Sequence, residues 1–204
     1  MSNTPTTSAG RASQQVELLR RREKLLGKNT PLFYDQPLHL VRGKGVHLYD
    51  VNGHEYLDVY NNVANVGHCH PRVVAALSGQ ASTLNIHTRY LHEAILDYAE
   101  NLTSTFADPL STVMFTCTGS EANDLALRVA RHATGAMGII CTRETYHGNT
   151  SAVDELATLF RAGEAVGAHV KSVPFPDGYR PEGGLQDQEL CDAYLRSIDQ
   201  AIAE

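Results

Sequence analysis

The sequence predicts an α/β protein in which a small antiparallel sheet is followed by a parallel sheet. In residues 38–60, apolar residues alternate with polar ones around glycine turns, a pattern typical of β-hairpins. From residue 113 onward, short apolar runs alternate with amphipathic helical patterns. This βαβαβα order is typical of parallel strands joined by right-handed crossovers. We therefore divide the chain into an N-terminal segment, 1–60, and an α/β domain, 61–204.

The N-terminal elements follow from local signals. We expect disorder in residues 1–12, which are rich in Ser, Thr and Gly, and a helix over 13–26 that Gly27 ends. Asn52-Gly53 is a turn signal within the small sheet. Pro71 is suited to the first turn of a helix over 71–80, and Asp108-Pro109 ends a second helix over 91–106.

The α/β domain is predicted to begin with a buried strand followed directly by a helix. The run from Val113 to Cys117 is apolar, β-branched or aromatic, and Ser120 is a suitable N-cap for the helical pattern after it. The later elements that we expect are strands at 136–142 and 169–173 and helices at 150–162 and 187–204.

Composition and charge narrow the class of protein. The chain has 204 residues, of which 42% are hydrophobic, enough for a sizeable core. A net charge of -6 argues against a nucleic-acid partner. No apolar run approaches a membrane span, and the N-terminus has no signal-peptide core. The cysteines lack CxxC spacing, so we expect reduced thiols, with Cys117 and Cys141 in buried strands, in a cytoplasmic protein.

The turn Thr118-Gly119-Ser120 between the predicted strand and helix is a candidate anion site. The first N–H groups of a helix lack intrahelical acceptors, the helix dipole favours negative charge there, and glycine admits a phosphate close to the backbone. An ordinary capped strand-to-helix turn is the alternative. A nucleotide phosphate is a further alternative, although the chain has neither GxGxxG nor a P-loop at this turn.

Two other segments carry side chains that could do chemistry. Gly67-His68-Cys69-His70-Pro71 suggests a metal site, but adjacent side chains diverge and no second ligand pair lies at a useful spacing. A turn before the next helix is the better interpretation. Tyr146-His147-Gly148-Asn149 follows a predicted strand, where α/β folds place ligands. His147 is either a general base or structural, and Tyr146 either stacks on a planar ligand or packs in the core.

Several motifs in register give the chain a family resemblance. The run from Thr118 to Asp124, then Tyr146-His147-Gly148, and upstream Gly67-His68-Cys69-His70-Pro71 resemble the class III aminotransferases. Asn61-Asn62-Val63-Ala64 and Arg89-Tyr90-Leu91-His92 are similar to the phospholyase branch of that family. The resemblance implies pyridoxal 5'-phosphate (PLP) as cofactor and fold type I, with this chain forming the first half of the large PLP-binding domain. It also implies elimination of phosphate from phosphoethanolamine to give ammonia, acetaldehyde and phosphate, by a homodimer.

The resemblance also implies roles for individual residues. Thr118, Gly119 and Ser120 would bind the cofactor phosphate. Tyr146 would stack on the cofactor ring, and His147 and Gly148 would line the same side of the cofactor pocket. The amine substrate would face four further residues: Asn61, Asn62, Arg89 and Asn149. Asn149 stands where the ornithine branch has a carboxylate-binding arginine, which favours a substrate without a carboxylate. For Arg89, an ion pair with Glu93 on the next helix is the alternative role.

No catalytic lysine can be assigned within the chain. The family's Schiff-base lysine is expected beyond Glu204, because none of the lysines present lies in a family-like motif (Lys24, Lys28, Lys44 and Lys171). Three interpretations stay open: a PLP-dependent lyase, an aminotransferase that transfers an amino group to a keto acid, and a non-catalytic fragment.

Overall fold

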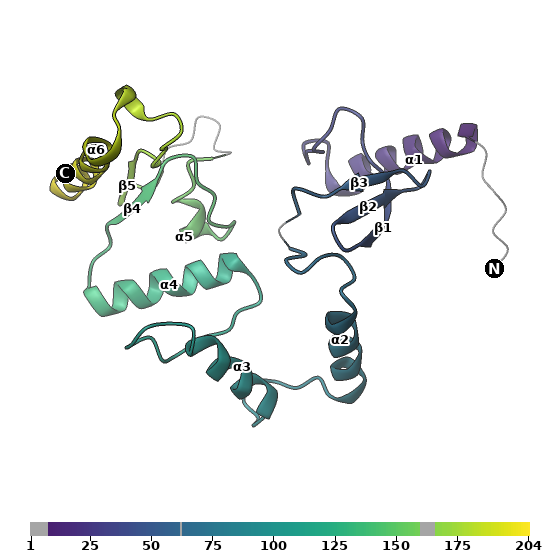
Figure 1. Cartoon of the computed structure of the whole chain (residues 1–204), viewed down its shortest axis with the longest axis horizontal. Helices are drawn as coiled ribbons and strands as arrows, with labels where there is room; N and C mark the ends of the chain where they lie inside the picture. Colours follow the sequence, from purple (N-terminus) through teal and green to yellow (C-terminus); the bar gives the residue numbers. More distant parts are fainter. Residues whose placement is uncertain (1–7, 62, 160–165) are drawn as a thin grey trace. The chain divides into compact units, whose positions relative to one another are not determined.

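A computed structural model describes residues 8–61, 63–159 and 166–204. These residues form two compact units, the first reaching Leu91 and the second running from His92 to Glu204. Figure 1 shows the elements of each unit along the chain. The division of the chain at residue 60 that the sequence predicts stays a prediction.

The first unit contains the predicted antiparallel sheet. Its three strands are β1 (Leu40–Lys44), β2 (His47–Asp50) and β3 (Glu55–Leu57), paired in that order. Gly45 and Gly53 adopt positive φ angles of 58° and 88°, which lets the chain reverse after β1 and after β2. Two helices flank the sheet in sequence, α1 (Ser8–Leu26) and α2 (Pro71–Thr83). The hairpins and both helices confirm the sequence-based prediction.

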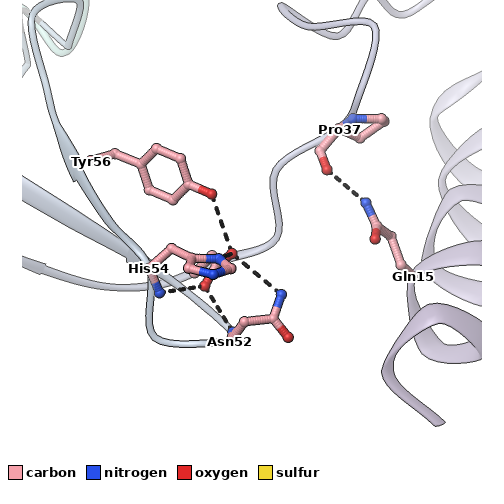
Figure 2. A network of polar contacts seen from close by, with 6 residues as sticks. Gln15, Pro37, Asn52, His54 and Tyr56 are labelled. Atoms are coloured by element: carbon pink, nitrogen blue, oxygen red, sulfur yellow. Dashed lines mark hydrogen bonds and ion pairs between the residues drawn. The ribbon is translucent and has the colours of Figure 1, made fainter. Parts of the chain in front are cut away.

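A buried carboxylate fixes the turn between β2 and β3. Asp50 is only 8% exposed, and its Oδ1 accepts the backbone N–H groups of Asn52 (2.8 Å) and His54 (2.9 Å). His54 Nδ1 lies 3.0 Å from Oδ2, and Tyr56 donates its hydroxyl to the same oxygen. Figure 2 shows the side chains of Asn52, His54 and Tyr56 converging on one point. Burial acts to raise the pKa of Asp50, but the bonds from His54 and Asn52 outweigh it and hold that pKa well below its usual range.

The second unit contains the predicted parallel strands. β4 (Ile139–Thr142) and β5 (Val170–Val173) pair in parallel, with Ile139 opposite Val170. α6 (Asp187–Ala203) packs against β5, as Figure 1 shows at the C-terminal end of the chain. The remaining helices are α3 (Glu93–Thr103), α4 (Gly119–Thr134), α5 (Ser151–Asp154) and a 3₁₀ turn at Glu182–Gly184. Among the described residues, the buried apolar side chains come from α5, the segment directly after it and β5: Val153, Leu156, Ala157, Val170 and Val173.

Several sequence-based predictions are wrong. Residues 8–12 are helical rather than disordered, consistent with the high helix propensity of Ala9 and Ala12. Residues 113–117 form no strand, because no strand within the described ranges pairs with them. Cys117 is accordingly exposed rather than buried. The cysteines are free thiols as predicted.

The helix predicted at 150–162 ends at Asp154. The N–H groups of Thr158 and Leu159 both donate to the Thr145 carbonyl, at 3.1 and 3.0 Å, instead of continuing the helix. Residues 160–162 of that prediction lie outside the described residues. No helix in the described ranges is long and apolar enough to cross a membrane.

Candidate active site

The start of α4 is organised by two residues that cap each other. Thr118 is the N-cap, and its Oγ1 accepts the N–H of Glu121 at 3.1 Å. Glu121 Oε2 in turn accepts the N–H groups of Cys117 (2.8 Å) and Thr118 (3.2 Å). The prediction that Ser120 is the N-cap is therefore wrong, because the Thr-x-x-Glu spacing forms a capping box that begins at Thr118. The sequence carried this signal in Thr118 and Glu121.

This capping leaves two donors for an anion. The N–H of Glu121 is taken by Thr118 Oγ1, and that of Ala122 by the Thr118 carbonyl. The N–H groups of Gly119 and Ser120 have no acceptor within the described parts of the chain. The positive end of the α4 dipole lies at the same two residues. A Cβ at Gly119 would meet nothing within 4 Å, so the backbone there is open to approach. These features fit a phosphate group.

The second predicted site segment follows β4 and is anchored at its base. Thr145 donates its N–H to Thr158 Oγ1 at 3.0 Å, and its carbonyl accepts two further N–H groups. Residues 146–149, which we call the wall loop, follow directly. Thr145 thus ties the wall loop to the segment after α5.

Two side-chain contacts join the wall loop to the first turns of α4. Ser120 donates its hydroxyl to Asn149 Oδ1 at 3.1 Å and accepts the Asn149 N–H at 3.2 Å. Asn123 donates its amide to the His147 carbonyl at 2.7 Å. Asn123 was not predicted from the sequence, since no local pattern relates residues 24 positions apart. The structure therefore places four of the predicted site residues together: Ser120, His147, Gly148 and Asn149.

Gly148 lies where the wall loop approaches α4 most closely. It is buried and has a φ angle of 138°, a conformation that side chains other than hydrogen rarely allow. A Cβ there would lie 2.5 Å from Ser120 Oγ and 2.8 Å from Ser120 Cα. Only glycine therefore fits against Ser120 without displacing the loop.

The two ring-bearing side chains of the wall loop are suited to a ligand. His147 Nε2 is buried and has no hydrogen-bond partner among the described residues. Buried polar atoms are normally paired, so this nitrogen is suited to a group that the described chain does not provide. Tyr146 is 59% exposed, which leaves surface available for a planar ring. Two helix N–H groups without an acceptor, an exposed aromatic ring and an unpaired imidazole nitrogen are together features that fit PLP.

Asn61, in the first unit, is held by a buried carboxylate. Asp58 is 7% exposed on its side chain; its Oδ1 accepts the Asn61 N–H, and its Oδ2 accepts the Asn61 amide, both at 2.9 Å. His68 Nε2 lies 2.7 Å from the same Oδ2. The bonds from the Asn61 backbone and from His68 hold the pKa of Asp58 well below its usual range. Asn62 lies outside the described residues, and the substrate roles of both asparagines stay predictions.

Arg89 lies in a turn before α3 and not on that helix. Its backbone N–H donates to His87 Nδ1 at 3.1 Å, and α3 begins only at Glu93, after the N-cap His92. The helical spacing on which the alternative Arg89–Glu93 ion pair depended is therefore absent. Arg89 is exposed, and its substrate role stays a prediction.

The histidine-rich segment has a structural place in the first unit. His68 pairs with Asp58, and its backbone exchanges hydrogen bonds with Gly45. His70 occupies the N-cap position of α2. No cluster of three metal-ligating side chains occurs within the described residues. The predicted turn before a helix is confirmed, because α2 begins at Pro71, directly after His70.

Lys171, which lies on β5, is engaged in an ion pair. Its Nζ lies 3.3 Å from Oε2 of Glu204, the C-cap residue that follows α6. This contact holds it at the β5–α6 packing. The expectation that the Schiff-base lysine lies beyond Glu204 stays a prediction.

Comparisons with known proteins agree with the geometry. A family model described as "Aminotransferase class-III" matches residues 33–204. The "Alanine–glyoxylate aminotransferase 2-like" protein of Drosophila melanogaster is 42% identical over 92% of this chain and 39% of its own length. The "Ethanolamine-phosphate phospho-lyase homolog 1" of Caenorhabditis elegans is 38% identical over 92% of this chain and 42% of its own length.

The solved structures include a similar fold at higher identity. A phospholyase from Arthrobacter in complex with phosphoethanolamine superposes with a TM-score of 0.83 and is 44% identical, covering 91% of this chain and 44% of that one. The chain thus spans about two fifths of the length of these relatives. The chain belongs to the class III aminotransferase family, whose members are PLP-dependent enzymes of fold type I.

Proposed function

We propose that the complete protein uses PLP to eliminate phosphate from phosphoethanolamine, with the net conversion of phosphoethanolamine and water to acetaldehyde, ammonia and phosphate. The observation that carries this proposal is the 44% identity, over 91% of the chain, to a phospholyase described in complex with phosphoethanolamine. The 38% identical nematode relative bears a phospho-lyase name as well.

The residues of this chain would bind and orient the cofactor. The N–H groups of Gly119 and Ser120, with the α4 dipole behind them, would hold its phosphate. Tyr146 would lie against its ring, and His147 would offer its unpaired Nε2 from the same wall. PLP, when bound, accepts the electron pair left on the substrate carbon that loses a proton.

Phosphoethanolamine carries a phosphate group in addition to that of the cofactor. The substrate phosphate needs hydrogen-bond donors of its own. Asn61 can supply only neutral hydrogen bonds, and its amide is already directed to Asp58. Arg89 supplies positive charge in a planar fork that matches phosphate, so we assign the substrate phosphate to it. Asp58 would hold Asn61 in place beside the substrate. We further propose that the protein is a cytoplasmic homodimer, as the family resemblance implies.

An aminotransferase is the second candidate, and one observation favours it. The fly relative, 42% identical over 92% of this chain, is named as an alanine–glyoxylate aminotransferase-like protein. The two reactions share the same cofactor and the same first proton removal. They differ in whether a leaving group on the next carbon departs.

The test measures both reactions in one preparation of the full-length protein. With phosphoethanolamine as substrate, released phosphate, acetaldehyde and ammonia should appear in equal amounts. With alanine and glyoxylate, the lyase proposal expects turnover that is slower by orders of magnitude. Efficient glycine formation without phosphate release would overturn the lyase proposal and leave the aminotransferase. Ethanolamine without phosphate serves as the control, because it lacks the leaving group.

A further inference from the structure

The hydroxyl of Ser120 both donates to and accepts from one residue of the wall loop. A serine hydroxyl has one proton to donate. Ser120 donates it to Asn149 Oδ1 at 3.1 Å and accepts the Asn149 N–H at 3.2 Å. The two residues are 29 positions apart, so this pair of bonds joins two separate segments. The hydroxyl proton of Ser120 is therefore not free for an anion while Asn149 holds it.

This occupation matters because of where Ser120 lies. It is the second residue of α4, and its own N–H and that of Gly119 are the donors left over by the capping box. A serine in the first turn of a helix can otherwise direct its hydroxyl to nearby backbone groups. Asn149 removes that freedom. It also sets the distance between the first turn of α4 and the wall loop, which Gly148 shows to be as short as a glycine permits.

We propose that Asn149 is a positioning residue for the cofactor phosphate, acting through the Ser120 hydroxyl, and not a residue that contacts the substrate. The inference rests on the PLP dependence within the proposed function but not on which reaction follows. Asn123 makes the second tie, from α4 to the His147 carbonyl, and so holds the part of the wall that faces the ring. Asn149 would thus position the phosphate end of the cofactor, and Asn123 would position the loop beside its ring.

The test compares two ligands that differ only in the phosphate. The full-length apo-protein is dialysed to equilibrium against PLP and, separately, against pyridoxal. Asn149→Ala should raise the Kd for PLP about three- to tenfold, the effect of one neutral hydrogen bond, and leave the Kd for pyridoxal unchanged. Asn123→Ala should raise the Kd for both PLP and pyridoxal. Asn101→Ala, an exposed asparagine of α3, is the matched control and should change neither.

A double-mutant cycle tests the route of the effect. If Asn149 acts through Ser120, Asn149→Ala should have no further effect on the Kd for PLP in a Ser120→Ala background. Additive losses would overturn the proposal, as would equal losses for PLP and pyridoxal. An unchanged Kd for PLP combined with a raised KM for phosphoethanolamine at saturating PLP would restore the substrate role to Asn149.

A second variant keeps the test informative if Asn149→Ala does not fold. Asn149→Asp keeps an oxygen acceptor for the Ser120 hydroxyl but adds a negative charge beside the phosphate site. This variant should fold. It should raise the Kd for PLP more than Asn149→Ala does and leave the Kd for pyridoxal unchanged. If the Asn149→Asp protein binds PLP as tightly as the wild type, the proposal is overturned. Because the readout is binding without substrate, a failure of the lyase proposal does not affect it.

Discussion

Gly148 and Ser120 are in contact across 28 residues of sequence, so closely that a Cβ on Gly148 would lie 2.5 Å from Ser120 Oγ. Real Cβ atoms do not approach other heavy atoms this closely. A side chain at position 148 must therefore move the wall loop away from α4. The φ angle of 138° adds strain to any such substitution.

Gly148→Ala should therefore both destabilise the protein and weaken cofactor binding. The strained backbone alone should lower the unfolding free energy by about 1–3 kcal/mol. The displacement would also move the wall loop, with Tyr146 and His147, away from the proposed phosphate site at the start of α4. Thermal unfolding of the apo-protein and the Kd for PLP are the measurements. Gly138→Ala is the control, because its Cβ would meet nothing within 4 Å and its φ angle is not positive. Equal behaviour of the two variants would contradict the expected contact.

Thr118→Ala tests the capping box at the start of α4. Loss of the Thr118 Oγ1 acceptor leaves the Glu121 N–H unsatisfied and should cost about 1 kcal/mol of unfolding free energy. Thr118→Ser keeps the acceptor and should retain most of that stability. Urea unfolding of both variants measures the difference. If alanine and serine at this position were equally stable, the cap would contribute nothing.

The lowered pKa of Asp58 predicts how stability depends on pH. A carboxylate with a folded-state pKa below its unfolded value stabilises the fold above the unfolded pKa of about 3.9, and that contribution is lost as the pH falls below it. Asp58→Asn should therefore be less stable than the wild type at neutral pH, with the difference shrinking below about pH 4. Asp50 acts in the same direction, so the variant keeps part of the acid sensitivity.

The control for this titration is Asp35→Asn, an exposed aspartate of the same unit. Its unfolding free energy is measured over the same pH range as that of Asp58→Asn. A wild-type minus Asp58→Asn difference that stayed constant from about pH 7 to about pH 3 would show that the Asp58 carboxylate is not held by its neighbours.

Arg89→Ala tests the assignment of the substrate phosphate. Loss of a charged hydrogen bond should raise the KM for phosphoethanolamine roughly ten- to a hundredfold, and the Kd for PLP should stay the same. Arg72→Ala, an exposed arginine on α2, controls for a general loss of positive charge. An unchanged KM would mean that Arg89 has a structural role only.

Local patterns predicted much of the fold. The glycines at 45 and 53 lie where the sheet turns, and the apolar runs around Ile139 and Val170 are the parallel strands. These elements depend on residues close in sequence, so their patterns are visible there. The N-cap of α4 was misplaced because Thr118 and Ser120 are both good caps, and only the Glu121 side chain, which reaches back, selects Thr118.

Contacts between distant residues could not be predicted. The helix expected at 150–162 fails because the Thr145 carbonyl takes the N–H groups of Thr158 and Leu159, which no local pattern indicates. The Ser120–Asn149 and Asn123–His147 contacts have the same character. The candidate site residues were found by motif, whereas the contacts that hold them together required the folded chain.

The capping box at the start of α4 is self-contained, and this has a consequence for how the family diversifies. Thr118 and Glu121 complete it with backbone groups of residues 117–121 alone. Substitutions elsewhere can then reshape the substrate side without rebuilding the turn that we propose for the cofactor phosphate. Relatives named for amino-group transfer and for phosphate elimination both match this chain. Selection can change the reaction while the turn stays as it is.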